Sequence, residues 1–145
     1  MSTQSANHQK GTPKYMAPEV FNNEDSSKSV DVYSFSLIVY EIITNQIPFK
    51  EYKSVIDLMN KVYNGARPLF PKDTPAVYQE LIEDCWDQNT KLRPSFDEIL
   101  ERLKNNHDFI TDQIDENKFY DYIEYIDSFT DKAPTIKNEV DLNLR

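Results

Sequence analysis

Glycine is scarce in this chain of 145 residues, which contains only Gly11 and Gly65. A loop that wraps the phosphates of a nucleotide needs several glycines close together, because only a backbone without side chains approaches phosphate oxygens closely. Two glycines so far apart exclude such a loop from this sequence. One cysteine rules out an internal disulfide, and with two distant histidines it is too little for a zinc site.

The sequence also has no long apolar run and no excess of positive charge. Its longest apolar stretch, Val30 to Ile43, is too short to span a bilayer and is interrupted by polar side chains. The first ten residues contain no apolar core of the kind that a signal peptide requires. A net charge of −9 is unfavourable for binding nucleic acid. We therefore expect a cytoplasmic protein with no nucleic-acid partner and no membrane partner.

The acidic charge is concentrated toward the C-terminus. Residues 1–106 have a net charge of −3, from 15 acidic and 12 basic side chains. Residues 107–145 have a net charge of −6, from 10 acidic and 4 basic side chains. This difference predicts that residues 106–145 form a separate acidic, aromatic tail.

Five segments carry helical patterns and none has the pattern of a strand, so the predicted fold class is all-α. The helices are expected from residue 30 to 44, 54 to 64, 75 to 86, from a capping box at Ser95 and Glu98 onward, and from 115 to 129. The first is apolar on nearly every face, which is typical of a helix buried on all sides. The last is amphipathic and is the one helix expected in the tail.

Three stretches in order carry a family resemblance: "GTPKYMAPEV", "SVDVYSFSLIVYEIITNQIPF" and "CWDQNTKLRPSFDEIL". They resemble the end of the activation segment, the central helix, and the last helices of the large lobe of a protein kinase domain. The closest likeness is to the tyrosine-kinase-like group of Ser/Thr kinases, over residues 10–104. The resemblance implies the helical C-lobe portion of the kinase fold, without the β-rich small lobe and without the catalytic loop. It divides the chain into an activation-loop remnant (1–10), a partial kinase domain (11–105) and the tail (106–145).

The resemblance assigns a structural ion pair to Glu19 and Arg93, which would tie the activation segment to the helical base. The alternative is two unrelated surface charges. Asp31 would anchor the catalytic loop, which this sequence does not contain. A carboxylate inside an all-apolar helix must find hydrogen-bond partners or destabilise the fold. Its alternative role is to interact favourably with the dipole at the start of its helix.

A substrate-binding loop is implied at Gly11, Thr12, Pro13 and Tyr15. Thr12 matches the threonine that helps to hold the catalytic aspartate in Ser/Thr kinases, and so implies serine/threonine specificity. The alternative is an ordinary loop threonine.

The sequence contains neither a glycine-rich loop nor a His-Arg-Asp motif, both of which kinases use for phosphoryl transfer. We therefore expect no catalytic, cofactor-binding or metal-binding residues in this chain, and MgATP only in an intact parent kinase. The start of the sequence at residue 1 is interpreted as a break within the activation segment of a kinase domain. The helix at residues 30–43 would then expose the side that the missing half covers.

Two functions remain open from the sequence. The first is a C-terminal fragment of a Ser/Thr kinase that phosphorylates proteins only in its intact parent. The second is a non-catalytic, kinase-like binding module or pseudokinase fragment. The partner would be a protein substrate, a regulatory protein, or the missing small lobe. A buried Asp31 without partners would favour the first function.

Overall fold

The computed structural model describes residues 12–22 and 27–130. Gly11, the expected activation-loop remnant at 1–10, and residues 131–145 of the tail lie outside these described residues. The chain divides into two compact units, one ending at Asn106 and the other beginning at His107.

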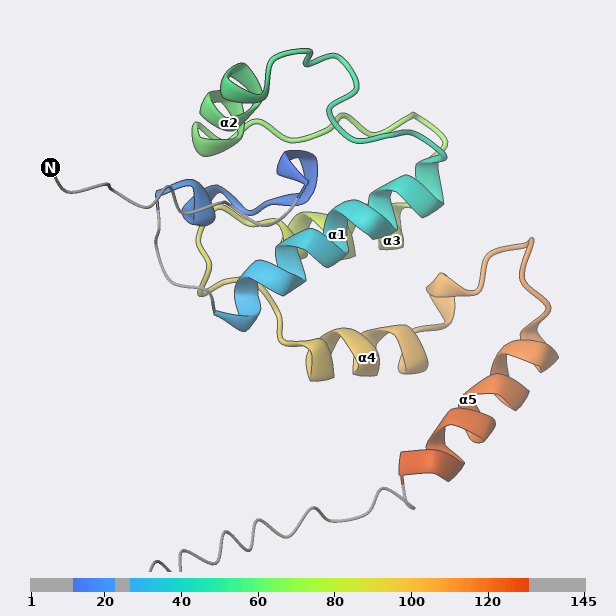
Figure 1. Cartoon of the computed structure of the whole chain (residues 1–145). Helices are drawn as coiled ribbons and strands as arrows, with labels where there is room; N and C mark the ends of the chain where they lie inside the picture. The colour runs from blue at the N-terminus through green and yellow to red at the C-terminus, as the bar shows by residue number, and fades with distance from the viewer. Residues whose placement is uncertain (1–11, 23–26, 131–145) are drawn as a thin grey trace, which may run out of the picture. The chain divides into compact units, whose positions relative to one another are not determined.

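All regular elements of the described residues are helical (Figure 1), so the all-α prediction is confirmed. The first unit contains η1 (Pro13–Tyr15), η2 (Pro18–Asn22), α1 (Lys28–Thr44), α2 (Val55–Tyr63), α3 (Ala76–Cys85) and α4 (Phe96–Asn105). The second contains η3 (His107–Phe109) and α5 (Glu116–Thr130). Each of the five predicted helices is present, whereas the three 3-10 turns were not predicted.

Short-range hydrogen bonds from side chains cap the starts of α2 and α4. The Ser95 hydroxyl accepts from the Glu98 amide at 3.2 Å, and the Glu98 carboxylate accepts from the Ser95 amide at 2.7 Å, which completes the predicted capping box. The Ser95 hydroxyl also donates to the Glu98 carboxylate at 2.9 Å, and the pKa of Glu98 is lowered by the bond from the Ser95 amide first and by the bond from this hydroxyl second. Ser54 caps α2 through the Asp57 amide. Helix α3 begins after Pro75, which supplies no side-chain cap.

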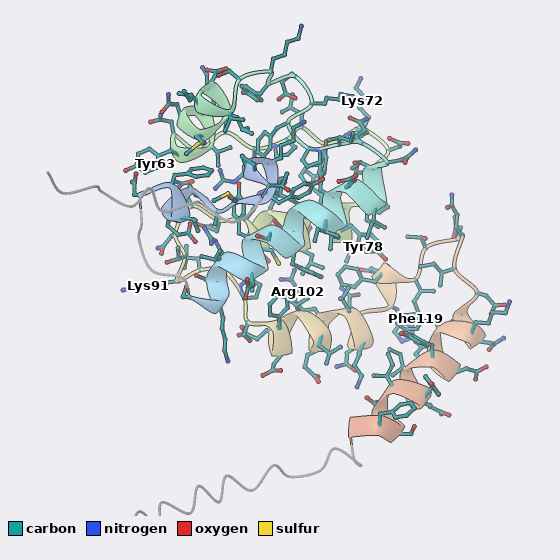
Figure 2. The ribbon with its side chains drawn as sticks, in the orientation of Figure 1. Tyr63, Lys72, Tyr78, Lys91, Arg102 and Phe119 are labelled. Atoms are coloured by element: carbon teal, nitrogen blue, oxygen red, sulfur yellow. The ribbon has the colours of Figure 1, made fainter. Side chains whose placement is uncertain are left out.

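The core of the first unit is built around α1, which packs on α3, while α2 packs on η1 and η2. Figure 2 shows side chains crowded around α1. The buried core residues are Ala17, Tyr33, Leu37, Tyr40, Phe49, Leu58, Val62, Ile82 and Trp86. Phe35 of α1 meets Phe96 of α4 edge-on, with ring centroids 5.6 Å apart. Cys85 is fully buried, and burial raises the pKa of its thiol to about 12, which makes it a structural residue.

The turn after α1 contains two left-handed residues. Asn45 ends the helix at φ 52°, a position that asparagine tolerates well. Phe49 has φ 55° although its side chain is bulky. Its ring is buried and packs edge-on against Tyr52, with centroids 6.1 Å apart. Burial of this ring offsets a backbone strain of about 1–2 kcal/mol.

The prediction that α1 is buried on all sides is wrong. Ile38 is 50% exposed and Ile42 is 72% exposed. Together with Tyr15 and Glu41 they line a cavity of about 450 Å³. An apolar side chain shows that a residue tolerates burial, but it does not reveal which neighbour covers it. The second expectation for this helix, that one of its sides is exposed, agrees with the exposure of Ile38 and Ile42.

Tyr33 of α1 lies between two guanidinium groups. The guanidinium carbon of Arg67 is 5.2 Å from its ring centroid and that of Arg93 is 5.1 Å away. Arg67 is held in turn by the carbonyl of Trp86, to which its Nε donates at 2.9 Å. The Tyr33 hydroxyl is buried without a hydrogen-bond partner among the described residues. The ring therefore stabilises this site, whereas the hydroxyl does not.

We predict that Tyr33→Phe keeps the ring and leaves the free energy of unfolding unchanged or raises it by about 1 kcal/mol. Tyr33→Leu removes both cation–π contacts and lowers the free energy of unfolding by about 2–4 kcal/mol. Urea titrations followed by the fluorescence of Trp86 measure both changes. Equal losses in the two variants would show that the hydroxyl matters.

A comparison of wild type with Tyr33→Phe also tests how stability depends on pH. Burial raises the pKa of Tyr33 from 10.0 to about 12. Between these values the unfolded chain loses the proton while the folded chain keeps it, so stability decreases as the pH rises from 10 to 12. We expect wild type to lose more stability over this interval than Tyr33→Phe, and parallel pH profiles would contradict this.

Candidate functional site

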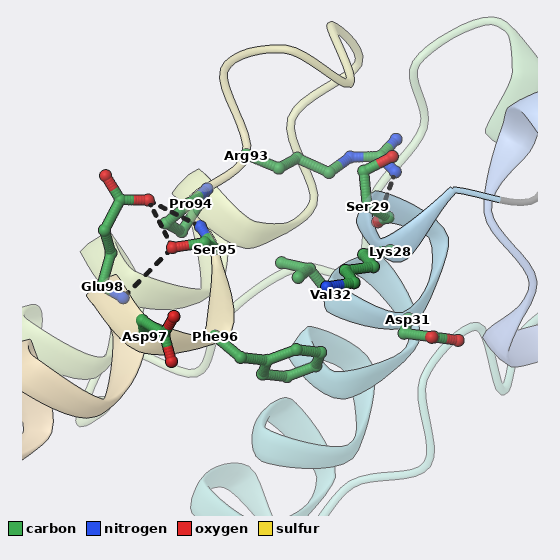
Figure 3. A pocket seen from close by; sticks show the side chains of 10 residues that line it. All are labelled: Lys28, Ser29, Asp31, Val32, Arg93, Pro94, Ser95, Phe96, Asp97 and Glu98. Atoms are coloured by element: carbon green, nitrogen blue, oxygen red, sulfur yellow. Dashed lines mark hydrogen bonds between the residues drawn. The ribbon is translucent and has the colours of Figure 1, made fainter. Parts of the chain in front are cut away.

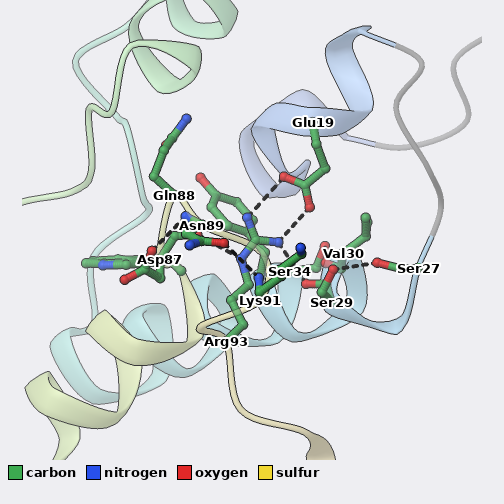
Figure 4. A network of polar contacts seen from close by, with 12 residues as sticks. Glu19, Ser27, Ser29, Val30, Ser34, Asp87, Gln88, Asn89, Lys91 and Arg93 are labelled. Carbon is green, nitrogen blue, oxygen red and sulfur yellow. Dashed lines mark hydrogen bonds and ion pairs between the residues drawn. The ribbon is translucent and has the colours of Figure 1, made fainter.

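The predicted site residues Glu19 and Arg93 lie together in a buried, bidentate ion pair (Figure 4). Arg93 Nη1 is 2.6 Å from Glu19 Oε1, and Nη2 is 3.0 Å from Oε2. The Arg93 side chain is 0% exposed and that of Glu19 is 10% exposed. The planar guanidinium matches the carboxylate in a way that a lysine does not.

Arg93 binds two further segments through backbone carbonyls. Its Nε donates to the carbonyl of Asp87 at 2.9 Å, and its Nη1 also donates to the carbonyl of Ser29 at 2.9 Å. One side chain therefore joins η2, the first turn of α1 and the connection between α3 and α4. Together with the face of Tyr33, these contacts account for the burial of a full positive charge.

Local turns set the direction of the Arg93 side chain. The Asp87 carboxylate accepts from the Asn89 amide at 2.7 Å, and the Asn89 side chain accepts from the Lys91 amide at 3.1 Å. Such side-chain-to-backbone bonds fold a short connection without regular structure. The sequence "DQNTK" thus positions Arg93, which lies two residues beyond it.

The predicted substrate loop is held on α1, as far as the structure describes it. Gly11 lies outside the described residues, Thr12 is exposed, and Pro13 opens η1. The Tyr15 hydroxyl donates to a Glu41 carboxylate oxygen at 2.5 Å, and the Ser34 hydroxyl donates to the Tyr15 carbonyl at 2.8 Å. The hydrogen bond to Glu41 raises the pKa of Tyr15, and burial adds to this effect. The arrangement fixes the end of the loop and leaves its threonine accessible.

Asp31 is exposed, so the expected need for hydrogen-bond partners inside the fold does not arise. It lies on the first turn of α1. There it borders a cavity of about 580 Å³ (Figure 3). The lining residues are Lys28, Ser29, Asp31, Val32, Arg93, Pro94, Ser95, Phe96, Asp97 and Glu98. Solvent replaces the partners that a buried carboxylate would require, and the first-turn position agrees with a dipole interaction.

Several contacts of the site carry no signature in the sequence. The carbonyls of Ser29 and Asp87 act through the backbone, so their residue type is irrelevant. Tyr33 is the one contact that the sequence could have indicated. It follows Ser29 by four residues and therefore shares a helix face with it. Glu41 and Ser34 could not be identified without knowing where η1 lies.

No group of three or more His, Cys, Asp or Glu side chains in residues 12–22 and 27–130 is arranged to hold a metal ion. Within the same residues, no helix has the length and apolar character needed to cross a membrane.

The region that contains the ion pair of Glu19 and Arg93 also matches a protein family. The family model for protein tyrosine and serine/threonine kinases matches residues 1–103. This chain therefore belongs to the protein kinase family, and it represents the C-terminal portion of the kinase domain.

Three curated relatives illustrate the likeness. The dual specificity protein kinase shkD of Dictyostelium discoideum is 44% identical over 95 residues, which cover 65% of this chain and 13% of that protein. The dual specificity protein kinase shkA of the same organism is 40% identical, covering 66% of this chain and 18% of that protein. The serine/threonine-protein kinase STY17 of Arabidopsis thaliana is 37% identical, covering 64% and 16%. The chain thus spans less than a fifth of each of these relatives.

We predict that Glu19→Gln lowers the free energy of unfolding by about 3–5 kcal/mol, because it leaves the buried charge of Arg93 without a counter-charge. Asp84→Asn provides a matched control. It makes the same carboxylate-to-amide change in the pair that Asp84 forms with Arg102 at 2.7 Å, where the two side chains are 55% and 35% exposed. The control should cost less than about 1 kcal/mol. Similar losses in urea titrations of both variants would contradict a special role for the buried pair.

Proposed function

We propose that this chain is the substrate-side part of the large lobe of a kinase that transfers phosphate from ATP to serine or threonine residues of proteins. The observation that carries the proposal is the bidentate pair of Glu19 and Arg93 within the family-matched region. The pair fixes η2 to the helical base, next to the segment that would contact a protein substrate. The exposed Thr12 supports serine/threonine specificity, because its hydroxyl is accessible to an aspartate from the rest of a kinase domain.

In our proposal this chain does not hold MgATP by itself. Two observations support this: the sequence contains neither a glycine-rich loop nor a His-Arg-Asp motif, and residues 12–22 and 27–130 contain no cluster of three or more His, Cys, Asp or Glu side chains arranged for a metal ion. In our proposal the nucleotide and the catalytic aspartate belong to other parts of the parent kinase. This chain positions the protein substrate and takes no part in the proton or phosphate transfer. The compartment that we propose for it is the cytoplasm.

A second candidate function is a non-catalytic binding module. Helix α2 supports it, since Val55 is 50% exposed, Ile56 is 73% exposed and Tyr63 is 50% exposed. Asp31 is exposed, so a stand-alone module would not contain a buried carboxylate without partners at this position.

We predict that the purified chain shows no binding of MgATP in isothermal titration calorimetry at millimolar nucleotide, and no autophosphorylation with radiolabelled ATP. An active kinase domain measured in the same buffer is the positive control. A saturable heat of binding or incorporation of label would contradict the prediction.

The mass of the protein in its source cells separates the two candidate functions. An antibody against the acidic tail should detect a band well above the 17.0 kDa of this chain. Peptides from that band should include a glycine-rich loop and a catalytic aspartate. A band at the mass of the chain itself would favour the binding module.

A further inference from the structure

Helix α5 lies outside the family-matched region, so the kinase family assigns it no role. Its apolar arc has two parts. Phe119, Ile123 and Ile126 are half-buried. Beside them run three aromatic side chains that form an exposed stripe: Tyr122 is 60% exposed, Tyr125 is 59% exposed and Phe129 is 57% exposed. The positions i, i+3 and i+7 place these three rings on one face of the helix.

The rings of the stripe contact one another. Tyr122 and Tyr125 stack with centroids 6.4 Å apart and an interplanar angle of 26°. Tyr125 and Phe129 meet edge-on at 4.8 Å and 80°. Rings that already support one another lose little conformational freedom on binding, which favours association with a partner.

Carboxylates border the apolar arc on both sides. Asp121 precedes Tyr125 by four residues, and Asp127 follows Ile123 by four, so each lies one helical turn from the arc. Over Glu116–Thr130 the sequence has four acidic side chains and one basic side chain, Lys118. A surface of this charge repels nucleic acids and anionic membranes and attracts a positively charged rim.

We propose that the aromatic stripe of α5 is a docking surface for a protein that presents an apolar groove bordered by lysine or arginine. Tyrosine rings suit such a partner, because they fill apolar pockets, accept cations on their faces and keep a hydroxyl in contact with water. Three half-exposed rings offer roughly 300 Å² of surface, which corresponds to a weak and transient interface.

The test uses the full chain and a defined probe. The probe is a fluorescein-labelled amphipathic peptide with a leucine face flanked by lysine and arginine. Its counterpart carries glutamate in place of every basic residue. Binding is measured by fluorescence anisotropy for wild type, for Tyr122→Gln/Tyr125→Gln, and for a control, Ile47→Gln/Leu69→Gln. The control removes apolar groups that are 54% and 87% exposed in the first unit and that lie outside helix α2.

All three chains carry the same net charge, so simple attraction between opposite charges cannot distinguish them. Glutamine is at least as good a helix former as tyrosine, and circular dichroism checks that α5 persists. We expect wild type and the control to bind the basic peptide equally. The tyrosine variant should bind at least about tenfold more weakly, since clustered aromatic residues dominate such interfaces. The acidic peptide should not bind.

Three results would overturn the proposal. Equal binding by all three chains would show that the stripe takes no part. A wild-type dimer in light scattering that becomes monomeric in the tyrosine variant would identify a second copy of the chain as the occupant. A lower melting temperature of the tyrosine variant, with no peptide binding by wild type, would show that the stripe packs on its own chain.

Discussion

The first unit is organised around a guanidinium group that does not contact water. Arg93 satisfies its charge through both oxygens of Glu19, two backbone carbonyls and the face of Tyr33. These partners come from segments far apart in the sequence, so the arginine is satisfied only when all of them are in place. A buried charge with incomplete partners is strongly unfavourable, which makes the arrangement nearly all-or-none. The positions of η2 and of the start of α1 depend on it.

Local signals in the sequence predicted the helices well. The capping box at Ser95 and the apolar spacing of α5 act over three or four residues, and both were read correctly. The turns η1 and η2 were missed because tertiary contacts hold them, such as the bond from Tyr15 to Glu41. The burial of α1 was overestimated for a related reason. Its apolar faces are local information, whereas what covers them is not.

The site was only partly readable from the sequence. Glu19 and Arg93 could be paired because the order of three motifs placed them in one family pattern. The carbonyls that complete the arginine site leave no trace in the sequence, since every residue has one. Asp31 was expected to need partners, but the site gives its carboxylate solvent instead. The sequence therefore indicates which two charges pair, but not which backbone carbonyls accept the remaining hydrogen bonds of Arg93.

The left-handed conformation of Phe49 has a consequence for the order of folding. The strain at this residue is intrinsic to the backbone, whereas the burial that offsets it requires the hydrophobic core of the first unit, which joins residues from Ala17 to Trp86, to have formed. The turn that contains Phe49 is therefore a poor nucleus, although its residues are close in sequence. Its native contacts should form after the rate-limiting step, so substitutions at this turn should speed unfolding more than they slow folding.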